Sequence, residues 1–503
     1  MPVTSTNLAE RLASILDASR VRGDAAALAG YAVDELAPRA VAKPASAEEA
    51  AEIVRFALAE NLAVVPVGSR SKMGIGMPPA RYDIALDMTA LNQIAHYDPG
   101  DLTLSVDAGC TLQSINAALT PQKQFLPLPQ GFGVPSTVAG TIASGVDSHL
   151  RQFFGTARDF LIGAEFIDGI GARCKSGGRV VKNVTGYDLH KLLIGSLGTL
   201  AIITRLNFRT FPLLASAESR AEMFVAAFAD AKSAVAFRQN IARSPFTPDA
   251  VELLSPELSK RFADYLPRSW EGQAARLGSW FSCSEWNVVV SFHGTPELRA
   301  RYVAAMTQLS ESAGAVATHA LQSAASDSAS DTSGEAATLN ALISGVARFL
   351  QNASRGATIF KIALLPAKLP ELFTGLAEIA LKWNLPHAFC ARGVGSAYFA
   401  LLPTDPSYCL SAAVAAGALT QQDVMEMGTG LTEQAFFELS KACDSIFALC
   451  AKQSATAFIQ FAPAALKRRI NVFGPERPDA SAMRRLKASF DPRNVFAPGR
   501  MFT

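Results

Sequence analysis

The sequence predicts an α+β protein with at least two domains, and three observations support this. A chain of 503 residues is about three times the usual length of one domain, so two or three hydrophobic cores are expected. Helices and strands alternate between residues 46 and 119, which is typical of an α/β layer. From residue 161 onward short strands and turns dominate, and further on strands alternate with helices, as in an α+β domain.

The first layer opens with Ser46-Ala-Glu-Glu49, a capping box that marks the start of a helix. The apolar run Leu62–Val67 follows as a buried strand. Residues Leu102–Val106 alternate as a second strand, and Leu112–Leu119 have the spacing of a helix.

A change of pattern follows, with a strand at Leu161–Ile167, a turn at Asp168-Gly169 and the apolar run Leu200–Thr204. Pro212 makes a natural domain boundary. Beyond it, the segments expected to alternate between strand and helix are Glu222–Gln239, Trp286–Phe292, Thr358–Leu365, Leu369–Trp383 and Ser396–Leu402. Residues 322–335 contain few bulky apolar side chains and are expected to form a surface insertion or flexible loop.

Composition is that of a soluble enzyme, with 49% hydrophobic residues, 18% charged residues and a net charge of +2. This balance does not predict binding to nucleic acid or to an acidic membrane surface. The seven cysteines are scattered and never spaced as C-x-x-C, so neither an iron–sulfur cluster nor a zinc site is expected. No signal peptide or transmembrane run is expected. A cytoplasmic location is predicted, and attachment to the inner membrane through partners stays open.

The first chemical motif is the glycine-rich loop Pro66–Gly76, directly after a buried strand. Gly68, Gly74 and Gly76 let the backbone approach a ligand and turn several amides toward one point, as a diphosphate requires. No G-x-G-x-x-G dinucleotide pattern opens a helix here, because Pro78-Pro79 stops any helix, and the Walker pattern is also absent. The alternative interpretation is a plain turn.

Two further motifs are rich in small residues. Gly131–Gly145 carries little side-chain bulk, so either a flat ligand lies against its main chain or the backbone packs tightly there. In Gly177–Leu189, Lys182 and Asn183 supply polar donors, and Gly195–Thr204 leads from a turn into a buried strand. A structural turn is again the alternative.

Together with Arg151–Gly155 and Arg158-Asp159, these motifs resemble the vanillyl-alcohol-oxidase flavoprotein superfamily in order and spacing. Within it, the form of residues 177–188 and the terminal segments 483–487, 490–492 and 498–501 is similar to the family of FAD-binding E subunits of bacterial glycolate oxidase. The resemblance covers residues 44–212 well and the middle of the chain in outline.

The resemblance implies a PCMH-type FAD-binding domain made of two α/β subdomains, a ferredoxin-like α+β cap domain and a short C-terminal return segment. The expected limits are 1–43 for a helical lead-in, 44–212 for the FAD domain, 213–470 for the cap with its insertion near 322–338, and 471–503 for the returning segment. The residues implied to bind FAD are Pro66, Gly68, Ser69, Arg70, Ser71, Lys72, Met73, Gly74, Pro129, Ser136, Thr137, Gly140, Thr141, Ala143, Ser144, Gly145, Lys182, Asn183, Gly198, Thr199, Ile202 and Ile203.

The FAD is expected to be non-covalent, because His149 is the only covalent-attachment candidate between Cys110 and Cys174. Related D-2-hydroxy-acid dehydrogenases add a histidine-rich metal site, but the six histidines here form no H-x-H or H-x-x-H pair, so no metal is expected. Arg151 and Arg392 are candidates to hold a substrate carboxylate, unless they are solvated or paired with acids.

Lone histidines such as His149 and His190 are more often packing or surface residues, and no catalytic base is assigned. The implied function is an FAD-binding subunit of a glycolate oxidase type complex that oxidises a 2-hydroxy acid. Its expected partners are a second flavoprotein subunit and an iron–sulfur subunit. A stand-alone FAD-dependent dehydrogenase of the D-lactate type is the alternative, and a scaffold that has lost FAD is a third hypothesis.

Overall fold

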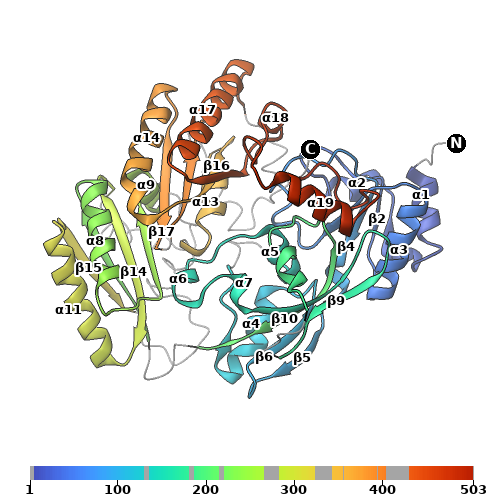
Figure 1. Cartoon of the computed structure of the whole chain (residues 1–503), viewed down its shortest axis with the longest axis horizontal. Coiled ribbons are helices and arrows are strands. Elements are labelled where there is room, and N and C mark those ends of the chain that lie inside the picture. The colour runs from blue at the N-terminus through green and yellow to red at the C-terminus, as the bar shows by residue number, and fades with distance from the viewer. Residues whose placement is uncertain are drawn as a thin grey trace.

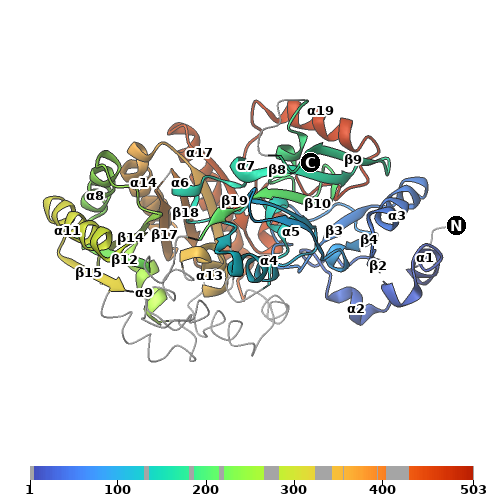
Figure 2. The ribbon, with the colours of Figure 1, turned by 90° about the horizontal axis from the view of Figure 1, so that it is seen from below.

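The structure is a computed structural model that describes residues 5–129, 135–180, 186–213, 220–264, 283–322, 343–354, 356–393, 395–403 and 430–501. Lys182, Asn183 and nearly all of the predicted insertion fall outside this set. Two bodies lie side by side in Figures 1 and 2. One is built on the amino-terminal elements and the last helix, and the other is the cap.

The amino-terminal body begins with a small sheet in the order β1 (Val21–Arg22), β2 (Ala40–Ala42), β4 (Ile84–Asp87), β3 (Val64–Val67). Strands β2 and β3 both run parallel to β4. Helices α1 (Ser5–Leu12), α2 (Ala25–Ala29) and α3 (Ala47–Ala59) accompany this sheet. As the capping box predicts, the Ser46 side chain accepts a hydrogen bond of 3.1 Å from the amide of Glu49 at the start of α3.

The second sheet of this body has five strands, all antiparallel to their neighbours. Their order is β5 (Ile94–Asp98), β6 (Thr103–Asp107), β10 (Ile202–Arg209), β8 (Leu161–Ile167), β9 (Arg173–Gly177). Helices α4 (Leu112–Leu119), α5 (Val138–Ser144), α6 (Arg151–Phe154) and α7 (Ala157–Phe160) belong to the same part of the chain. One hydrophobic core includes Val64 of the first sheet and Leu206 of the second, so the two sheets share it.

The cap contains an antiparallel sheet of eight strands, in the order β15-β12-β14-β13-β17-β18-β16-β19. Its first half is β12 (Arg220–Phe228), α8 (Ala231–Arg243), β13 (Ala250–Leu254), β14 (Trp286–Gly294), α11 (Pro296–Ser312) and β15 (Ala317–Gln322). Its second half is β16 (Thr358–Ala363), α14 (Leu369–Lys382), β17 (His387–Arg392), β18 (Ser396–Leu401), α17 (Glu433–Lys452) and β19 (Thr456–Phe461).

Each half therefore has the βαββαβ order of a ferredoxin-like unit. Where the sequence predicts one such cap, the structure has two of these units joined edge to edge. Three residue pairs between β13 and β17 form the joint, beginning with Glu252 opposite Arg392.

The two faces of the cap sheet meet different partners. Phe237 of α8, Met306 of α11, Leu376 of α14 and Ile446 of α17 share one core with alternate residues of the strands. The opposite face packs on α9 (Pro256–Asp264) and α13 (Val346–Ala353), and on three residues of the amino-terminal body, namely Ile75, Val146 and Leu197.

After the cap, the chain returns to the amino-terminal body through α19 (Ala480–Phe490). Val64 donates its amide to the Val495 carbonyl at 2.8 Å, and its carbonyl accepts from Ala497 at 2.9 Å. Residues 495–497 thereby lie along β3, immediately before the glycine-rich loop.

Candidate active site

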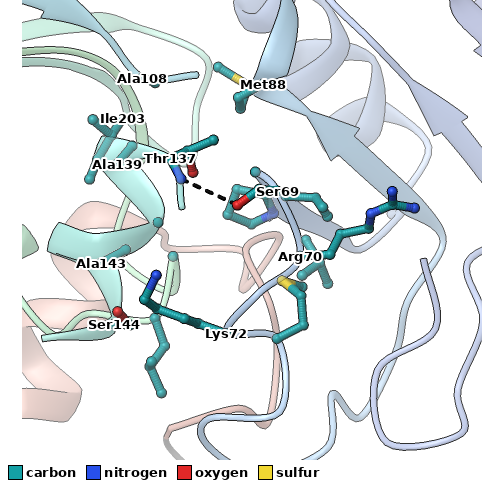
Figure 3. A pocket seen from close by; sticks show the side chains of 18 of the residues that line it. Ser69, Arg70, Lys72, Met88, Ala108, Thr137, Ala139, Ala143, Ser144 and Ile203 are labelled. Carbon is teal, nitrogen blue, oxygen red and sulfur yellow. Dashed lines mark hydrogen bonds between the residues drawn. The ribbon is translucent and has the colours of Figure 1, made fainter. Parts of the chain in front are cut away.

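A pocket lies between the loop after β3, helix α5 and the turn that leads into β10 (Figure 3). It encloses about 740 Å³, part of it open to solvent. The lining residues are Val65, Pro66, Val67, Gly68, Ser69, Arg70, Ser71, Lys72, Met73, Met88, Ala108, Thr137, Ala139, Gly140, Ala143, Ser144, Leu197, Gly198, Ala201, Ile203 and Arg500. The loop and the small-residue stretch thus converge on one cavity.

The loop is held to α5 by side chains of its own. The Thr137 amide, at the start of α5, donates to Ser69 Oγ at 3.2 Å. Arg70 has φ of +62° and turns away from α5 (Figure 3), where Nη1 donates to the Gly30 carbonyl at 2.9 Å and the guanidinium lies over the Tyr31 ring. Arg70 therefore helps to fix the loop.

Lys72 extends along the other side of the pocket, toward α5 (Figure 3). Its Nζ donates to Ser136 Oγ at 2.8 Å, to Ser71 Oγ at 3.3 Å and to Thr141 Oγ1 at 3.4 Å. These three partners are neutral hydroxyls, and they orient the ammonium group within the pocket wall.

Two glycines permit the close approach of these segments. A Cβ on Gly68 would come within 2.1 Å of Thr137 Oγ1 at the start of α5. A Cβ on Gly198 would lie 2.4 Å from Pro66 Cγ. The backbone packs tightly around the small-residue stretch and also leaves a cavity beside it, and binding of a flat ligand there stays a prediction.

The lining suits a dinucleotide such as FAD. The walls are glycine and alanine backbone with apolar side chains, against which a flat ring system can lie, and Lys72 and Arg500 supply positive charge for a diphosphate. In that arrangement the 68–72 loop would hold the diphosphate, and residues of α5 and β10 would hold the rings.

Thirteen of the residues expected to bind FAD line this pocket: Pro66, Gly68, Ser69, Arg70, Ser71, Lys72, Met73, Thr137, Gly140, Ala143, Ser144, Gly198 and Ile203. Ser136 and Thr141 stand behind the lining as partners of Lys72. The remaining described ones, Gly74, Pro129, Gly145, Thr199 and Ile202, are not among the lining residues. The carbonyls of Gly74, Gly145 and Thr199 instead accept hydrogen bonds from Lys467, Lys361 and Lys487.

Sequence reasoning missed eight lining residues: Val65, Val67, Met88, Ala108, Ala139, Leu197, Ala201 and Arg500. Seven of them are apolar. Val65 and Val67 belong to the predicted strand before the loop, and Ala139, Leu197 and Ala201 lie inside the small-residue segments, whereas Met88 and Ala108 lie outside every motif that the sequence indicates. Arg500 had no local signal, because only the return of the chain brings it to the loop.

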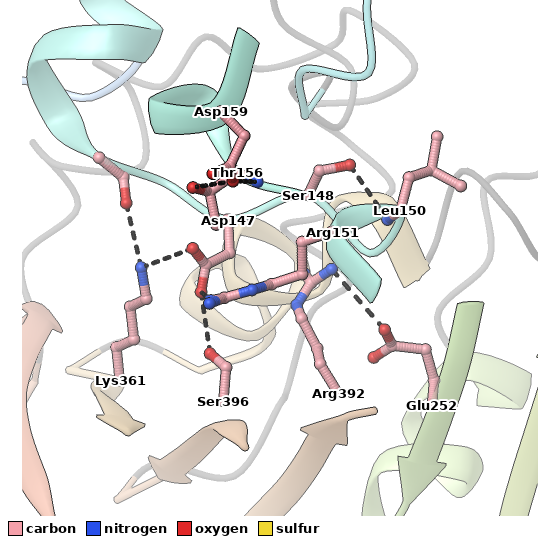
Figure 4. Close-up of polar contacts among 11 residues, drawn as sticks. Asp147, Ser148, Leu150, Arg151, Thr156, Asp159, Glu252, Lys361, Arg392 and Ser396 are labelled. Atoms are coloured by element: carbon pink, nitrogen blue, oxygen red, sulfur yellow. Dashed lines mark hydrogen bonds and ion pairs between the residues drawn. The ribbon is translucent and has the colours of Figure 1, made fainter. Parts of the chain in front are cut away.

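A buried polar cluster lies next to the pocket, where the two bodies meet (Figure 4). Asp147, three residues after Ser144, accepts from Arg151 Nη1 at 2.7 Å and from Ser396 Oγ at 2.8 Å. Lys361 Nζ lies 3.1 Å from Asp147 Oδ1 and donates to the Gly145 carbonyl at 3.0 Å. Burial acts to raise the pKa of Asp147, but Lys361 and Arg151 outweigh it and hold that pKa below its usual range.

Arg392 and Glu252 extend this cluster along the joint of the cap sheet. Arg392 is 1% exposed, and its Nη1 lies 3.7 Å from Glu252 Oε1, too far for a hydrogen bond. Nε and Nη1 of Arg392 have no hydrogen-bond partner among the described residues. Burial raises the pKa of Glu252, against the opposing charge of Arg392. The Arg392 carbonyl accepts from Arg238 Nη2 at 2.6 Å.

The two histidines nearest the flavin motifs, His149 and His190, are buried. His190 is 2% exposed and its Nδ1 lies 3.0 Å from Ser176 Oγ, while His149 is 5% exposed. Neither is among the pocket-lining residues. Within the described part of the chain, no group of three or more His, Cys, Asp or Glu side chains is placed to hold a metal ion.

Two family models match the chain. "FAD binding domain" matches residues 38–177, and "FAD linked oxidases, C-terminal domain" matches residues 218–396 and 474–501. These matches cover both bodies and the returning segment, and they agree with the fold. The chain has the PCMH-type FAD-binding fold. FAD is the cofactor of this flavoprotein.

Known proteins resemble this flavoprotein over different lengths. Glycolate oxidase subunit GlcE of Escherichia coli (strain K12) is 36% identical over 162 residues, which are 32% of this chain and 46% of that protein. Glycolate oxidase subunit GlcD of Bacillus subtilis (strain 168) is 25% identical over 472 residues, 92% of this chain and 89% of that one. The flavoprotein therefore spans less than half the length of the GlcE relative.

A solved structure of p-cresol methylhydroxylase with substrate bound has a TM-score of 0.70 at 15% identity, covering 99% of this flavoprotein and 96% of that chain. This likeness shows the shared fold. Among the described residues, no helix of the flavoprotein combines the length and apolar character needed to cross a membrane.

Proposed function

We propose that this flavoprotein oxidises the CH–OH group of a 2-hydroxy acid to a 2-oxo acid. When bound, FAD supplies the acceptor for the two electrons removed from the substrate. The protein must then bind the substrate carboxylate beside the flavin. The names of the two glycolate oxidase relatives support this substrate class.

The observation that carries the proposal is the excess of buried positive charge at the junction of the two bodies. The cluster holds four cations and two acids: Arg151, Arg238, Lys361 and Arg392 against Asp147 and Glu252. Leaving guanidinium N–H groups buried without a partner is costly, so the unpartnered Nε and Nη1 of Arg392 favour an anionic ligand. A carboxylate matches the geometry of a guanidinium.

Each protein group has a role in this arrangement. Arg392 would bind the carboxylate, in agreement with the expectation from the sequence. Arg151 is paired with Asp147, so it would act on the substrate mainly through its positive charge and less through a direct hydrogen bond. Because its pKa is lowered, Asp147 stays ionised and orients Arg151, Lys361 and Ser396. No catalytic base is assigned.

The FAD is proposed to be held without a covalent bond. Among the residues that the structure describes, no cysteine or histidine lines the pocket. Precipitating the protein with acid should release all of the flavin into the supernatant. Yellow colour that stays with the pellet would contradict this proposal.

The finer proposal is that the chain is an FAD-binding subunit of a glycolate oxidase type complex, beside a second flavoprotein and an iron–sulfur subunit. The similarity to the GlcE relative supports it. The alternative of a stand-alone dehydrogenase is supported by a different observation. The cap of this same chain supplies Arg392 and Lys361 to the cationic cluster, so the proposed substrate site needs no second subunit.

The deciding experiment is to record the visible spectrum of the purified chain and then add glycolate or D-lactate without oxygen. Loss of the flavin absorbance near 450 nm (roughly, for any bound flavin) in the isolated chain would favour the stand-alone enzyme. Bleaching only after the partner subunits are added would favour the complex. A colourless protein that takes up no added FAD would exclude both and favour the scaffold hypothesis.

A further inference from the structure

We propose that Arg500 is a ligand of the FAD diphosphate, brought to the pocket by the carboxyl-terminal segment. This inference rests on the proposed binding of FAD in the pocket. Among the described lining residues, Arg500 is the only one that follows Ile203 in the sequence. It is 3% exposed, so it forms part of the pocket wall and not of the outer surface.

The main chain and one nitrogen fix Arg500 against the second half of the loop. Nη2 donates to the Met73 carbonyl at 2.8 Å and also to the Ile75 carbonyl. The Arg500 carbonyl accepts from the Met77 amide at 2.9 Å. Gly76 has φ of +93°, and a Cβ there would lie 2.9 Å from that carbonyl. The side chain is therefore positioned before any ligand arrives.

The other terminal nitrogen is unused. Arg500 Nη1 is buried and has no hydrogen-bond partner among the described residues. An unpaired N–H of a charged group is costly in a buried position, and a phosphate oxygen would satisfy it with a charge-assisted hydrogen bond.

The charges around the loop lead to the same ligand. Asp34 is the acid whose charge acts on Arg500, but both of its oxygens already accept from Lys467 Nζ at 2.8 Å. Two buried cations therefore share one carboxylate, which leaves a positive charge at the pocket wall. The anionic group of FAD is its diphosphate, and guanidinium groups are well suited to phosphate.

Arg500 would act opposite Lys72. The third lining cation, Arg70, is occupied with the Gly30 carbonyl and the Tyr31 ring. Lys72 comes from the loop itself and Arg500 from the far end of the chain, so the diphosphate would join two segments that are distant in sequence.

The test uses the full chain freed of flavin and compares wild type with Arg500→Met and Arg500→Lys. Affinities for FAD, ADP and adenosine are measured by flavin fluorescence and by calorimetry. Arg500→Met should weaken FAD and ADP binding about 10- to 100-fold, the range expected for one hydrogen bond to a charged group, and leave adenosine binding unchanged. Arg500→Lys should retain part of the affinity for ADP because it keeps the charge.

A matched control separates phosphate binding from the shape of the loop. The double variant Asp34→Asn with Lys467→Met removes the other cation that holds this loop, through the Gly74 carbonyl, and leaves no unpaired acid. It should change ADP and adenosine affinity by the same factor. Circular dichroism and thermal unfolding establish that each variant is folded.

Unchanged FAD and ADP affinity in Arg500→Met would overturn the inference. So would an equal loss for ADP and adenosine, because Arg500 would then act only by shaping the loop. If Arg500→Met does not fold, the ratio of ADP to adenosine affinity in Arg500→Lys decides in the same way. If the wild-type chain does not bind FAD at all, the proposed function fails together with this inference. A loss seen only in the Arg500 variants, or no loss in them, concerns the inference alone.

Discussion

Gly198 lies directly against Pro66, so that a Cβ added at Gly198 would come within 2.4 Å of Pro66 Cγ. Gly198 belongs to the turn before β10, and Pro66 lies in β3 just before the loop. The two sheets of the amino-terminal body therefore touch through these residues at the wall of the pocket. The spacing between them sets the width of the proposed FAD site.

Gly198→Ala is expected to destabilise the protein and to weaken FAD binding. Gly198 has φ of +68°, which alone costs a non-glycine residue about 1 kcal/mol or more, and the contact with Pro66 adds to it. Gly314→Ala is the matched control, since Gly314 has φ of +85° with nothing within 4 Å of an added Cβ. Urea unfolding should give a clearly larger loss of unfolding free energy for Gly198→Ala than for Gly314→Ala. Equal losses would mean that the contact between Gly198 and Pro66 does not affect stability.

Gly68→Ala should abolish or strongly reduce FAD binding, because the added methyl group would lie 2.1 Å from Thr137 Oγ1 and force α5 and the loop apart. Gly74→Ala, in the same loop, meets nothing within 4 Å and should bind FAD as wild type does. Flavin fluorescence titration of the two apoproteins measures the difference. Equal affinities would show that the approach of the loop to α5 is not needed for the cofactor.

Arg392→Lys should lower kcat/KM for the 2-hydroxy acid by about 10- to 100-fold, the range for losing one strong hydrogen bond to a charged group. The effect should appear mainly in KM if Arg392 binds the carboxylate. The exposed pair of Arg477 and Asp479 offers a control, and Arg477→Lys should leave the kinetics unchanged. A variant at 392 with wild-type kinetics and an unchanged FAD spectrum would remove Arg392 from the substrate site.

Stability should fall as the pH drops below about 6.5, the ordinary pKa of histidine. Burial lowers the pKa of His190 in the folded protein, so the unfolded chain binds more protons between the two pKa values and stability rises with pH there. His387, whose pKa is also lowered by burial, adds to the same trend. The free energy of unfolding, measured with urea from pH 5 to 7, should depend less on pH in His190→Gln than in wild type. The slopes should differ by less than about 1.4 kcal/mol per pH unit. An unchanged slope would mean that His190 has the same pKa in the folded and the unfolded chain.

The amino-terminal body could be predicted in some detail because its signals are local. The cap of α3 is set by Ser46, and the loop after Val67 follows from its glycines. The doubling of the cap was not predictable in this way. All six residues of β18 (Ser396–Leu401) are buried, so the strand lacks the alternation that assigns a face to each residue.

The polar part of the site depends on tertiary structure. Asp147, Lys361 and Ser396 come together only when the cap packs on the amino-terminal body, and sequence spacing does not report this. The sequence indicates that Arg392 could hold a carboxylate, but the burial of its side chain and the nitrogens without a hydrogen-bond partner are visible only in the folded chain. The expectations for Lys182 and Asn183 stay predictions, as do the domain limits.

Each half of the cap sheet consists of four strands that pair with one another, and only three residue pairs between β13 and β17 join the two halves. Glu252 and Arg392 form the end pair of that joint, and each also pairs within its own half, Glu252 with Val289 and Arg392 with Ser396. The proposed carboxylate ligand therefore stands where the backbones of the two halves meet, so its position depends on how the halves are joined.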